Sequence, residues 1–160
     1  MYKILFLIFI SLFFVSCSSK NNAFKYFEKD EIETKGVQYT KKTDILTKEN
    51  EVDVIFWATY LNKVDKKISD TNEELFLVSV YFTNKESQDI FENNYLFLLN
   101  GIEPISLEKV EKDNENFKSL MLKNNWGKYY LVKFTSQDVY NLTIQLKDQG
   151  ANSAQLNFEK

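Results

Sequence analysis

The feature that most limits how this chain can fold is an alternation of apolar and polar residues along several short segments. The clearest example runs from Tyr140 to Leu146, where every second side chain is apolar and those between are polar. A period of two places the apolar side chains on one face of a β-strand. Alternating or continuous apolar segments predict further strands at residues 37–46, 52–61, 74–83, 95–99, 102–110, 128–135 and 154–159. A chain with this pattern is expected to be mostly β.

The predicted strands are short and closely spaced, and no helix long enough for a βαβ unit separates them. Seven or eight such strands are typical of an antiparallel β-sandwich, and a small β-barrel is the alternative. Residues 52–61 are substantially apolar on both faces, which predicts a central strand that is covered on both sides. Asn100-Gly101 predicts a tight hairpin turn between the strands that flank it. Pro104 should place the second of these strands at a sheet edge.

Two segments fit the strand pattern less clearly. In residues 24–35, the side chains of Phe24, Phe27 and Ile32 lie roughly on one helical face. A short helix or an irregular segment that packs its aromatics on the domain is expected there, and an exposed aromatic patch is the alternative. Residues 117–122 fit either a short helix or a strand.

The tripeptide Asp138-Val139-Tyr140 stands directly before the clearest alternating strand. It resembles the tyrosine corner of immunoglobulin-like sandwiches, in which the tyrosine hydroxyl bonds to nearby backbone. The resemblance implies an immunoglobulin-like sandwich of seven to eight strands. The alternative interpretation is simply a tyrosine that enters a strand.

The first residues have a different character from the rest of the chain. Lys3 is followed by twelve residues, 4–15, that are apolar except for Ser11. A helix of that length spans about 18 Å, whereas the hydrocarbon core of a bilayer is about 30 Å thick. The segment is therefore too short for a comfortable transmembrane helix and fits the apolar region of a signal peptide.

This segment ends in Phe14-Val15-Ser16-Cys17, which resembles the lipobox of a bacterial lipoprotein signal peptide. The resemblance implies cleavage before Cys17, so that residues 1–16 are a signal peptide, and attachment of lipid to the Cys17 thiol. Phe14 departs from the family pattern, in which leucine is usual. The alternative is an ordinary secretory peptide that leaves Cys17 as a free thiol. Because Cys17 is the only cysteine, no disulfide can form within the chain.

Lipidation would anchor this protein to a membrane surface. One acyl chain holds only marginally, but lipoproteins of this family carry more than one, so attachment would be effectively permanent. Ser18 and Ser19 follow the cysteine without an aspartate, which resembles an outer-membrane address. Residues 17–23 are expected to be the lipidated cysteine and a short polar tether, and residues 24–160 a single domain. The expected location is the cell envelope, at the outer membrane, facing the periplasm or the surface.

Composition excludes several classes of function. All 20 basic residues are lysine, there is no histidine, and 23 residues are acidic. Loss of Lys3 with the signal peptide leaves 19 − 23, a net charge of −4, which argues against nucleic acid as a partner. The missing histidine excludes Ser-His and Cys-His catalysis and the usual catalytic zinc site. We therefore expect a protein that is not an enzyme, with no cofactor and no metal.

Two kinds of candidate site remain in the sequence. Acidic residues gather at Asp70, Glu73 and Glu74 and at Asp113 and Glu115, in predicted loops. Calcium would use such oxygen ligands, but neither group has the regular spacing and glycine turn of a known calcium loop, so solvated turns are favoured.

The densest polar and aromatic group contains Trp126, Tyr129 and Tyr130, next to two asparagines. These side chains form a candidate binding surface, since tryptophan and tyrosine stack on sugars and anchor peptides. The alternative is a loop whose tryptophan packs over the end of the sandwich.

Three functions are consistent with these observations. The leading one is a non-catalytic envelope lipoprotein that binds another envelope protein or a surface polymer. The second is a carrier of a small apolar ligand, which requires an open apolar interior. The third is a glycan hydrolase with two carboxylates facing each other about 5–9.5 Å apart.

Overall fold

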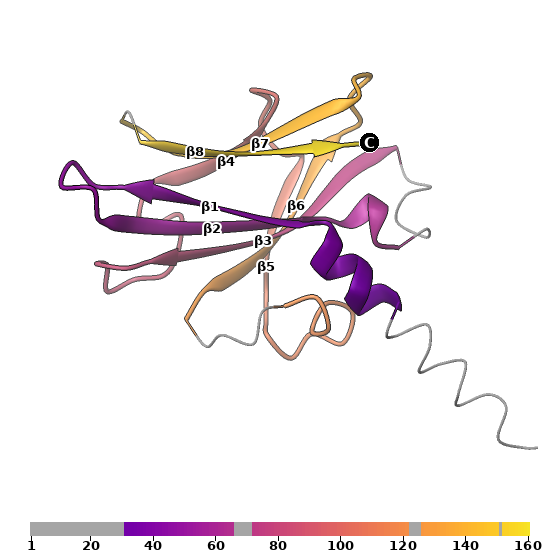
Figure 1. The fold of residues 1–160 in the computed structure, drawn as a ribbon, viewed down its shortest axis with the longest axis horizontal. Helices are drawn as coiled ribbons and strands as arrows, with labels where there is room; N and C mark the ends of the chain where they lie inside the picture. The colour runs from indigo at the N-terminus through magenta and orange to yellow at the C-terminus, as the bar shows by residue number, and fades with distance from the viewer. Residues whose placement is uncertain (1–30, 66–71, 122–125, 151) are drawn as a thin grey trace, which may run out of the picture. The chain divides into compact units, whose positions relative to one another are not determined.

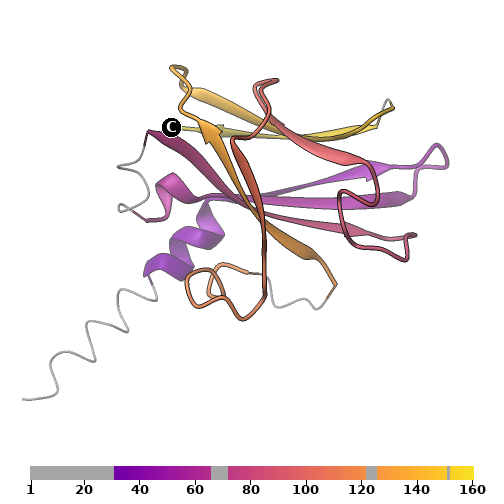
Figure 2. The ribbon, with the colours of Figure 1, turned by 180° about the vertical axis from the view of Figure 1, so that it is seen from behind.

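The computed structural model describes residues 31–65, 72–121, 126–150 and 152–160. Residues Ile32–Lys160 form one compact unit, in which two antiparallel sheets pack face to face (Figure 1, Figure 2). The sheets hold five and three strands and do not close on one another. The expected antiparallel sandwich is therefore confirmed, and the barrel alternative is excluded.

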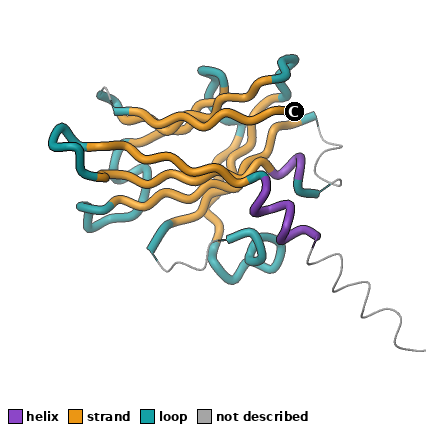
Figure 3. The backbone as a smooth tube through the Cα atoms, in the orientation of Figure 1, coloured by secondary structure: helices purple, strands orange, loops and turns teal. Residues whose placement is uncertain are grey.

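Strands dominate the described residues (Figure 3). A helix at residues 31–38 precedes the first strand, and a short 3-10 helix, η2 (Leu61–Lys63), follows the second. The strands that lie within the described residues are β1 (Thr40–Leu46), β2 (Val52–Tyr60), β3 (Glu73–Phe82), β4 (Tyr95–Leu99), β5 (Ser106–Val110), β6 (Lys128–Thr135), β7 (Asn141–Asp148) and β8 (Ser153–Glu159).

The strand order identifies the kind of sandwich. The larger sheet runs β1-β2-β3-β6-β5 and the smaller sheet runs β4-β7-β8. Without β1, the seven strands β2 to β8 correspond in chain order to the letters A to G. The larger sheet then has the order A-B-E-D, and the smaller sheet has the order C-F-G. That is the arrangement of an immunoglobulin constant-type domain. The chain thus has an immunoglobulin-like sandwich with β1 added beside its first strand.

The core between the sheets is built by the inward side of each alternating strand. On β7, Leu142, Ile144 and Leu146 are fully buried, as the alternation predicts. On β3, Phe76 is also fully buried, with its ring centroid 5.0 Å from that of Tyr60 and 5.4 Å from that of Phe158 on β8. Aromatic rings from both sheets therefore interlock around Phe76.

The larger sheet is also covered on its outer face. A second apolar cluster, here called the outer cluster, lies there and contains Leu61, Leu77, Val110, Met121 and Tyr129, with Leu75, Phe117, Leu120 and Leu131 packed against it. The cover comes from residues 117–121, which form turns and are neither the helix nor the strand considered for 117–122. β2 lies between β1 and β3, so the central strand predicted at residues 52–61 is confirmed. β3 is also a central strand and is buried on both of its faces.

The predicted hairpin at Asn100-Gly101 is only partly present. Both residues have positive φ, +49° and +83°, as a tight turn requires, and Leu99 and Ile102 form a bridge across it. The chain then leaves β4 and crosses to the other sheet, where β5 pairs with β6. The prediction of a return strand beside β4 is therefore wrong. As Pro104 indicated, β5 is an edge strand.

Two other predictions need correction. Tyr140 stands directly before β7, where a tyrosine corner belongs, but its side chain is 62% exposed and does not point inward. Its hydroxyl donates to a carboxylate oxygen of Glu159 at 3.0 Å, and not to backbone, so the tyrosine-corner interpretation is wrong. The strand predicted at 37–46 begins only at Thr40, because the helix runs to residue 38.

Replacing Phe76 with alanine should reduce the free energy of unfolding by about 3–5 kcal/mol, because a fully buried aromatic ring is lost from an interlocked core. Phe91→Ala is the matched control, since Phe91 is 61% exposed, and its effect should stay within about 0.5 kcal/mol. Urea unfolding of both variants measures the two values. Similar losses in the two variants would contradict the packing described here.

Candidate functional site

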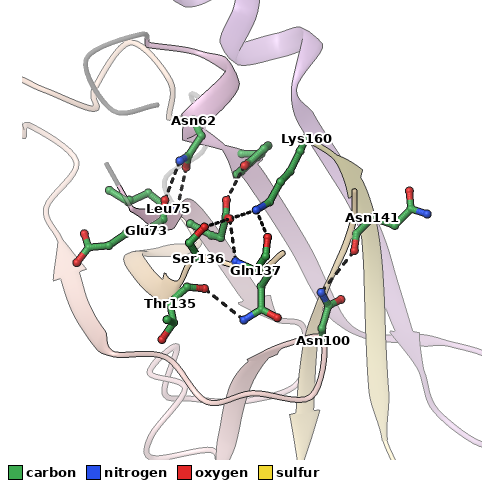
Figure 4. A network of polar contacts seen from close by, with 11 residues as sticks. Asn62, Glu73, Leu75, Asn100, Thr135, Ser136, Gln137, Asn141 and Lys160 are labelled. Carbon is green, nitrogen blue, oxygen red and sulfur yellow. Dashed lines mark hydrogen bonds and ion pairs between the residues drawn. The ribbon is translucent and has the colours of Figure 1, made fainter. Parts of the chain in front are cut away.

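A buried carboxylate, Glu74, lies at the start of β3 at one end of the sandwich. From the sequence, Glu74 is grouped with the acidic residues of a loop, at the first position of the strand predicted at 74–83. It is the second residue of β3 and is 2% exposed. Tyr60 donates its hydroxyl to Glu74 Oε2 at 2.6 Å. Ser136 donates its hydroxyl and Gln137 its backbone N–H to Glu74 Oε1, at 3.3 and 3.2 Å. Both residues are labelled in Figure 4, beside Lys160.

Lys160 completes this group, here called the Glu74 cluster. Its ammonium lies 2.5 Å from Glu74 Oε1 and also donates to the backbone carbonyl of Gln137. The backbone N–H of Lys160 donates to the carbonyl of Tyr140 at 3.0 Å. Charge-assisted hydrogen bonds of this kind are about twice as strong as neutral ones. The cluster therefore ties the residue after β8 to the central strand β3 of the other sheet.

The protonation states follow from these contacts. Burial alone would raise the pKa of Glu74, but hydrogen bonds from Lys160, Tyr60 and Gln137 outweigh it, so the pKa lies below its ordinary value of 4.5. Burial, followed by the hydrogen bond to Glu74 and its negative charge, raises the pKa of Tyr60. Near neutral pH the carboxylate is therefore ionised and the phenol protonated.

A pocket of about 250 Å³ adjoins this cluster, but its groups are poorly suited to acid–base chemistry. Glu74 is held ionised by several donors, whereas a general acid or base works best with a pKa near the operating pH. The neighbouring Glu73 points to the opposite face of β3, as adjacent strand residues do, and its carboxylate lies 3.4 Å from the Lys133 ammonium. The arrangement suits a structural tie.

A larger pocket lies on the outer face of the five-stranded sheet. This outer groove has a volume of about 500 Å³ and is lined by Glu33, Gly36, Val37, Thr40, Lys41, Lys42, Trp57, Ser119, Leu120 and Met121. The helix at 31–38 supplies one wall, β1 and β2 supply the second, and residues 119–121 supply the third. Its position is set by the outer cluster, to which Leu120 and Met121 belong.

Close contacts hold these walls together. A Cβ atom added at Gly36 would lie 2.4 Å from Leu120 Cδ2, so the missing side chain lets the helix approach the 119–121 segment. Thr40 donates its hydroxyl to the Gly36 carbonyl at 2.6 Å and lies 2.6 Å from the Thr59 hydroxyl. These contacts tie the helix to both β1 and β2.

The polar end of the groove is formed by β1. Lys42 is paired across the strands with Trp57, and its ammonium lies 5.8 Å from the centroid of the Trp57 ring. The same ammonium is 3.3 Å from Asp44, and its side chain is half exposed. Lys41 points to the other face of β1, where its ammonium donates to the Asn157 carbonyl at 2.6 Å.

The three aromatic residues predicted as a binding surface do not form one. Trp126 is 67% exposed, and its ring centroid lies 5.9 Å from that of Tyr81. Tyr129 and Tyr130 are buried on opposite faces of β6, in the outer cluster and in the core between the sheets. The Tyr130 hydroxyl accepts a hydrogen bond from the backbone N–H of Ile90 at 3.2 Å. Only Trp126 of this group is available to a partner, and the predicted surface is corrected accordingly.

The other sequence-based candidates are placed as follows. Cys17, the proposed lipidation site, and Asp70 lie outside the described residues. Nowhere in the described ranges do three histidine, cysteine or acidic side chains gather as a metal site would require. The part of the chain that can be described contains no helix of sufficient length and apolarity to cross a bilayer.

Sequence reasoning missed the outer groove and the Glu74 cluster. Trp57 lies in the segment predicted as a central strand, 52–61, but its neighbours in the groove include residues of a helix and a loop that are distant in sequence. Comparison with protein-family models, curated proteins and solved structures finds no match.

Glu74→Gln should lower the free energy of unfolding at pH 7 by about 2–3 kcal/mol, because it leaves Lys160 and Tyr60 without an ionised partner. The folded-state pKa of Glu74 is lowered, so the wild type holds this advantage above about pH 4.5 and loses it as pH falls through that lowered value. Denaturant unfolding of both proteins between pH 7 and pH 3 measures the change.

Glu73→Gln is the matched control, since this neighbouring carboxylate belongs to a partly exposed ion pair worth at most about 1 kcal/mol. A deficit in Glu74→Gln that stays constant down to pH 3, or equals that of Glu73→Gln, would contradict the assignment.

Proposed function

We propose that this chain is a lipid-anchored protein of the cell envelope whose immunoglobulin-like domain is a non-catalytic binding or structural module. The observation that carries the proposal is the apolar segment that ends in Ser16-Cys17, with the chain's only cysteine at the position that resembles a lipidation site. The serines that follow favour an outer-membrane address. The polar tether of residues 17–23 would hold the domain near the membrane, facing the periplasm or the surface.

The domain itself supports a binding or structural role in two ways. Its buried carboxylate Glu74 is engaged by hydrogen-bond donors and an ammonium, so it serves to join the two sheets. The chain lacks histidine and arginine and carries a net negative charge, which favours another envelope protein over nucleic acid as the partner. Immunoglobulin-like sandwiches also host many binding functions, although that step is an analogy between folds.

A carrier of a small apolar ligand is the second candidate. The outer groove favours it, because its volume of about 500 Å³ lies within the usual range for ligand sites. The groove lies on the outer face of the larger sheet, and not in the interior between the sheets where the sequence-based hypothesis placed the ligand. Binding there is compatible with a lipid anchor.

Cys17→Ser should abolish labelling of the protein by a clickable palmitate analogue, and should move the protein out of the membrane fraction or leave it unprocessed. The reason is that serine has no thiol to receive the lipid. Membrane fractionation and labelling of cells that express the full chain measure both effects.

The control for this test is the double variant Cys17→Ser with Ser19→Cys, which restores a thiol two positions later. It should remain unlabelled, because lipidation depends on the position of the cysteine directly after the signal peptide. Wild-type fractionation and labelling of Cys17→Ser would refute the anchor and the location together.

Cross-linking in intact cells tests the proposal that the domain binds another component of the envelope. We expect the anchored protein to form a specific cross-link with an envelope component, and deletion of the chain to weaken the envelope against detergent. Absence of both effects would remove support for a binding or structural role while leaving the anchor intact.

A further inference from the structure

We propose that the outer groove is a binding site for a small amphiphile, with an elongated apolar body and one acidic headgroup. The inference rests on the second candidate function, a ligand carrier that uses this groove, and it does not depend on lipidation of Cys17. It concerns a different surface from Trp126, the one exposed member of the predicted aromatic group.

The groove has the size and lining that an apolar body requires. Its volume of about 500 Å³ lies within the roughly 300–1,000 Å³ typical of small-molecule sites. Trp57, Leu120 and Met121 supply a broad apolar surface, and methionine adapts readily to different ligand shapes. Val37 adds an apolar side chain at the rim, where it is 79% exposed. An exposed valine beside an aromatic wall is a surface that an apolar ligand would remove from water.

The groove is also formed before any ligand arrives. The helix is held by the Thr40 hydroxyl on the Gly36 carbonyl and by the close contact of Gly36 with Leu120. Leu120 and Met121 are in turn packed on the outer cluster of the sheet. Because the walls are fixed by these contacts, little ordering entropy is lost when a ligand enters.

The charged residues around the groove indicate that the headgroup of the ligand is acidic. The Lys42 ammonium lies against the Trp57 ring and is half exposed, and Asp44 is the one carboxylate paired with it among the described ion pairs. A lysine ammonium has three N–H donors, so donors remain for an acidic headgroup beside the one that faces Asp44. Lys41 cannot take this role, because its ammonium is directed to Asn157 on the other face of β1. Glu33, on the helix wall, favours an orientation in which the headgroup lies at the β1 end.

Two other pockets in the described part of the chain fit this ligand less well. The pocket beside Glu74 is smaller, about 250 Å³, and its polar groups are occupied by one another. A pocket of about 400 Å³ beside Val110 and Tyr129 is lined by both lysines and acidic residues, so its lining carries charges of both signs. Neither combines a broad apolar wall with a half-exposed lysine ammonium against an aromatic ring.

Fluorescence of Trp57 provides the test. The chain has two tryptophans, so Trp126→Phe leaves Trp57 as the only one, inside the groove. The full chain carrying Trp126→Phe and Cys17→Ser is titrated with dodecanoate and with dodecan-1-ol, below the concentrations at which they aggregate. We expect a saturable change of Trp57 emission with both probes, and tighter binding of dodecanoate by about twofold to fivefold, as one exposed ion pair allows.

Charge substitutions at the exposed rim separate the apolar and acidic parts of the proposal. Val37→Glu and Val37→Lys should bind dodecanoate with affinities that differ by about fivefold or more in favour of lysine, since the two charges act in opposite directions. Dodecan-1-ol should not distinguish them. Val139→Glu and Val139→Lys are the matched controls, because Val139 is also exposed, at 48%, and does not line the groove. Both should bind like the parent chain.

Lys42→Met should remove the preference for dodecanoate over dodecan-1-ol, whereas Lys48→Met, in the turn after β1, should keep it. A Trp57 emission that does not saturate with either probe would overturn the site. Equal responses of the Val37 and Val139 pairs, or a preference that survives Lys42→Met, would overturn the assigned position or headgroup. None of these results would alter the outcome expected for Cys17→Ser. The proposed amphiphile site and the proposed lipid anchor can therefore be refuted independently.

Discussion

The burial of β3 on both faces is the constraint on which the rest of the domain depends. Its inward side supplies Phe76 to the aromatic core between the sheets, and its outward side supplies Leu77 to the outer cluster. Its second residue, Glu74, binds Lys160 at the end of the chain. A single strand therefore joins the two sheets, the cover of residues 117–121 and the last strand. Because both faces are needed, the outer cover is as much a part of the fold as the core.

Much of this arrangement could be predicted from the sequence, because strand alternation is a local property. The inward residues of β7, including Leu142 and Ile144, follow directly from a period of two. An immunoglobulin-like sandwich was expected without its strand order, although the tyrosine corner that suggested it is absent: Tyr140 is exposed and bonds to Glu159. The right fold was thus inferred in part from a contact that the molecule does not make.

The features that could not be predicted from the sequence depend on which strands pair with one another. Asn100-Gly101 makes the turn that its residues favour, but a turn does not determine which sheet the chain joins next. In the same way, Trp57 faces the outer groove beside Lys42 only because β1 pairs with β2 in this register. The burial of Glu74 could not be predicted, because its ammonium partner, Lys160, is 86 positions later in the sequence. Neighbours of this kind are visible only once the chain is folded.

The elements that depart from the seven-stranded immunoglobulin order are also the ones that build the groove. Without β1, Trp57 would stand on an edge strand with no lysine beside it, and the helix would have no Thr40 to hold it to the sheet. Charged residues on edge strands normally serve to prevent association with other chains, and Lys41 fits that role by reaching across to β8. Lys42 sits on the opposite face, against an aromatic ring and beside an apolar pocket. Protection of the edge would need a charge there but no pocket, so the position of Lys42 is consistent with the amphiphile site that we propose.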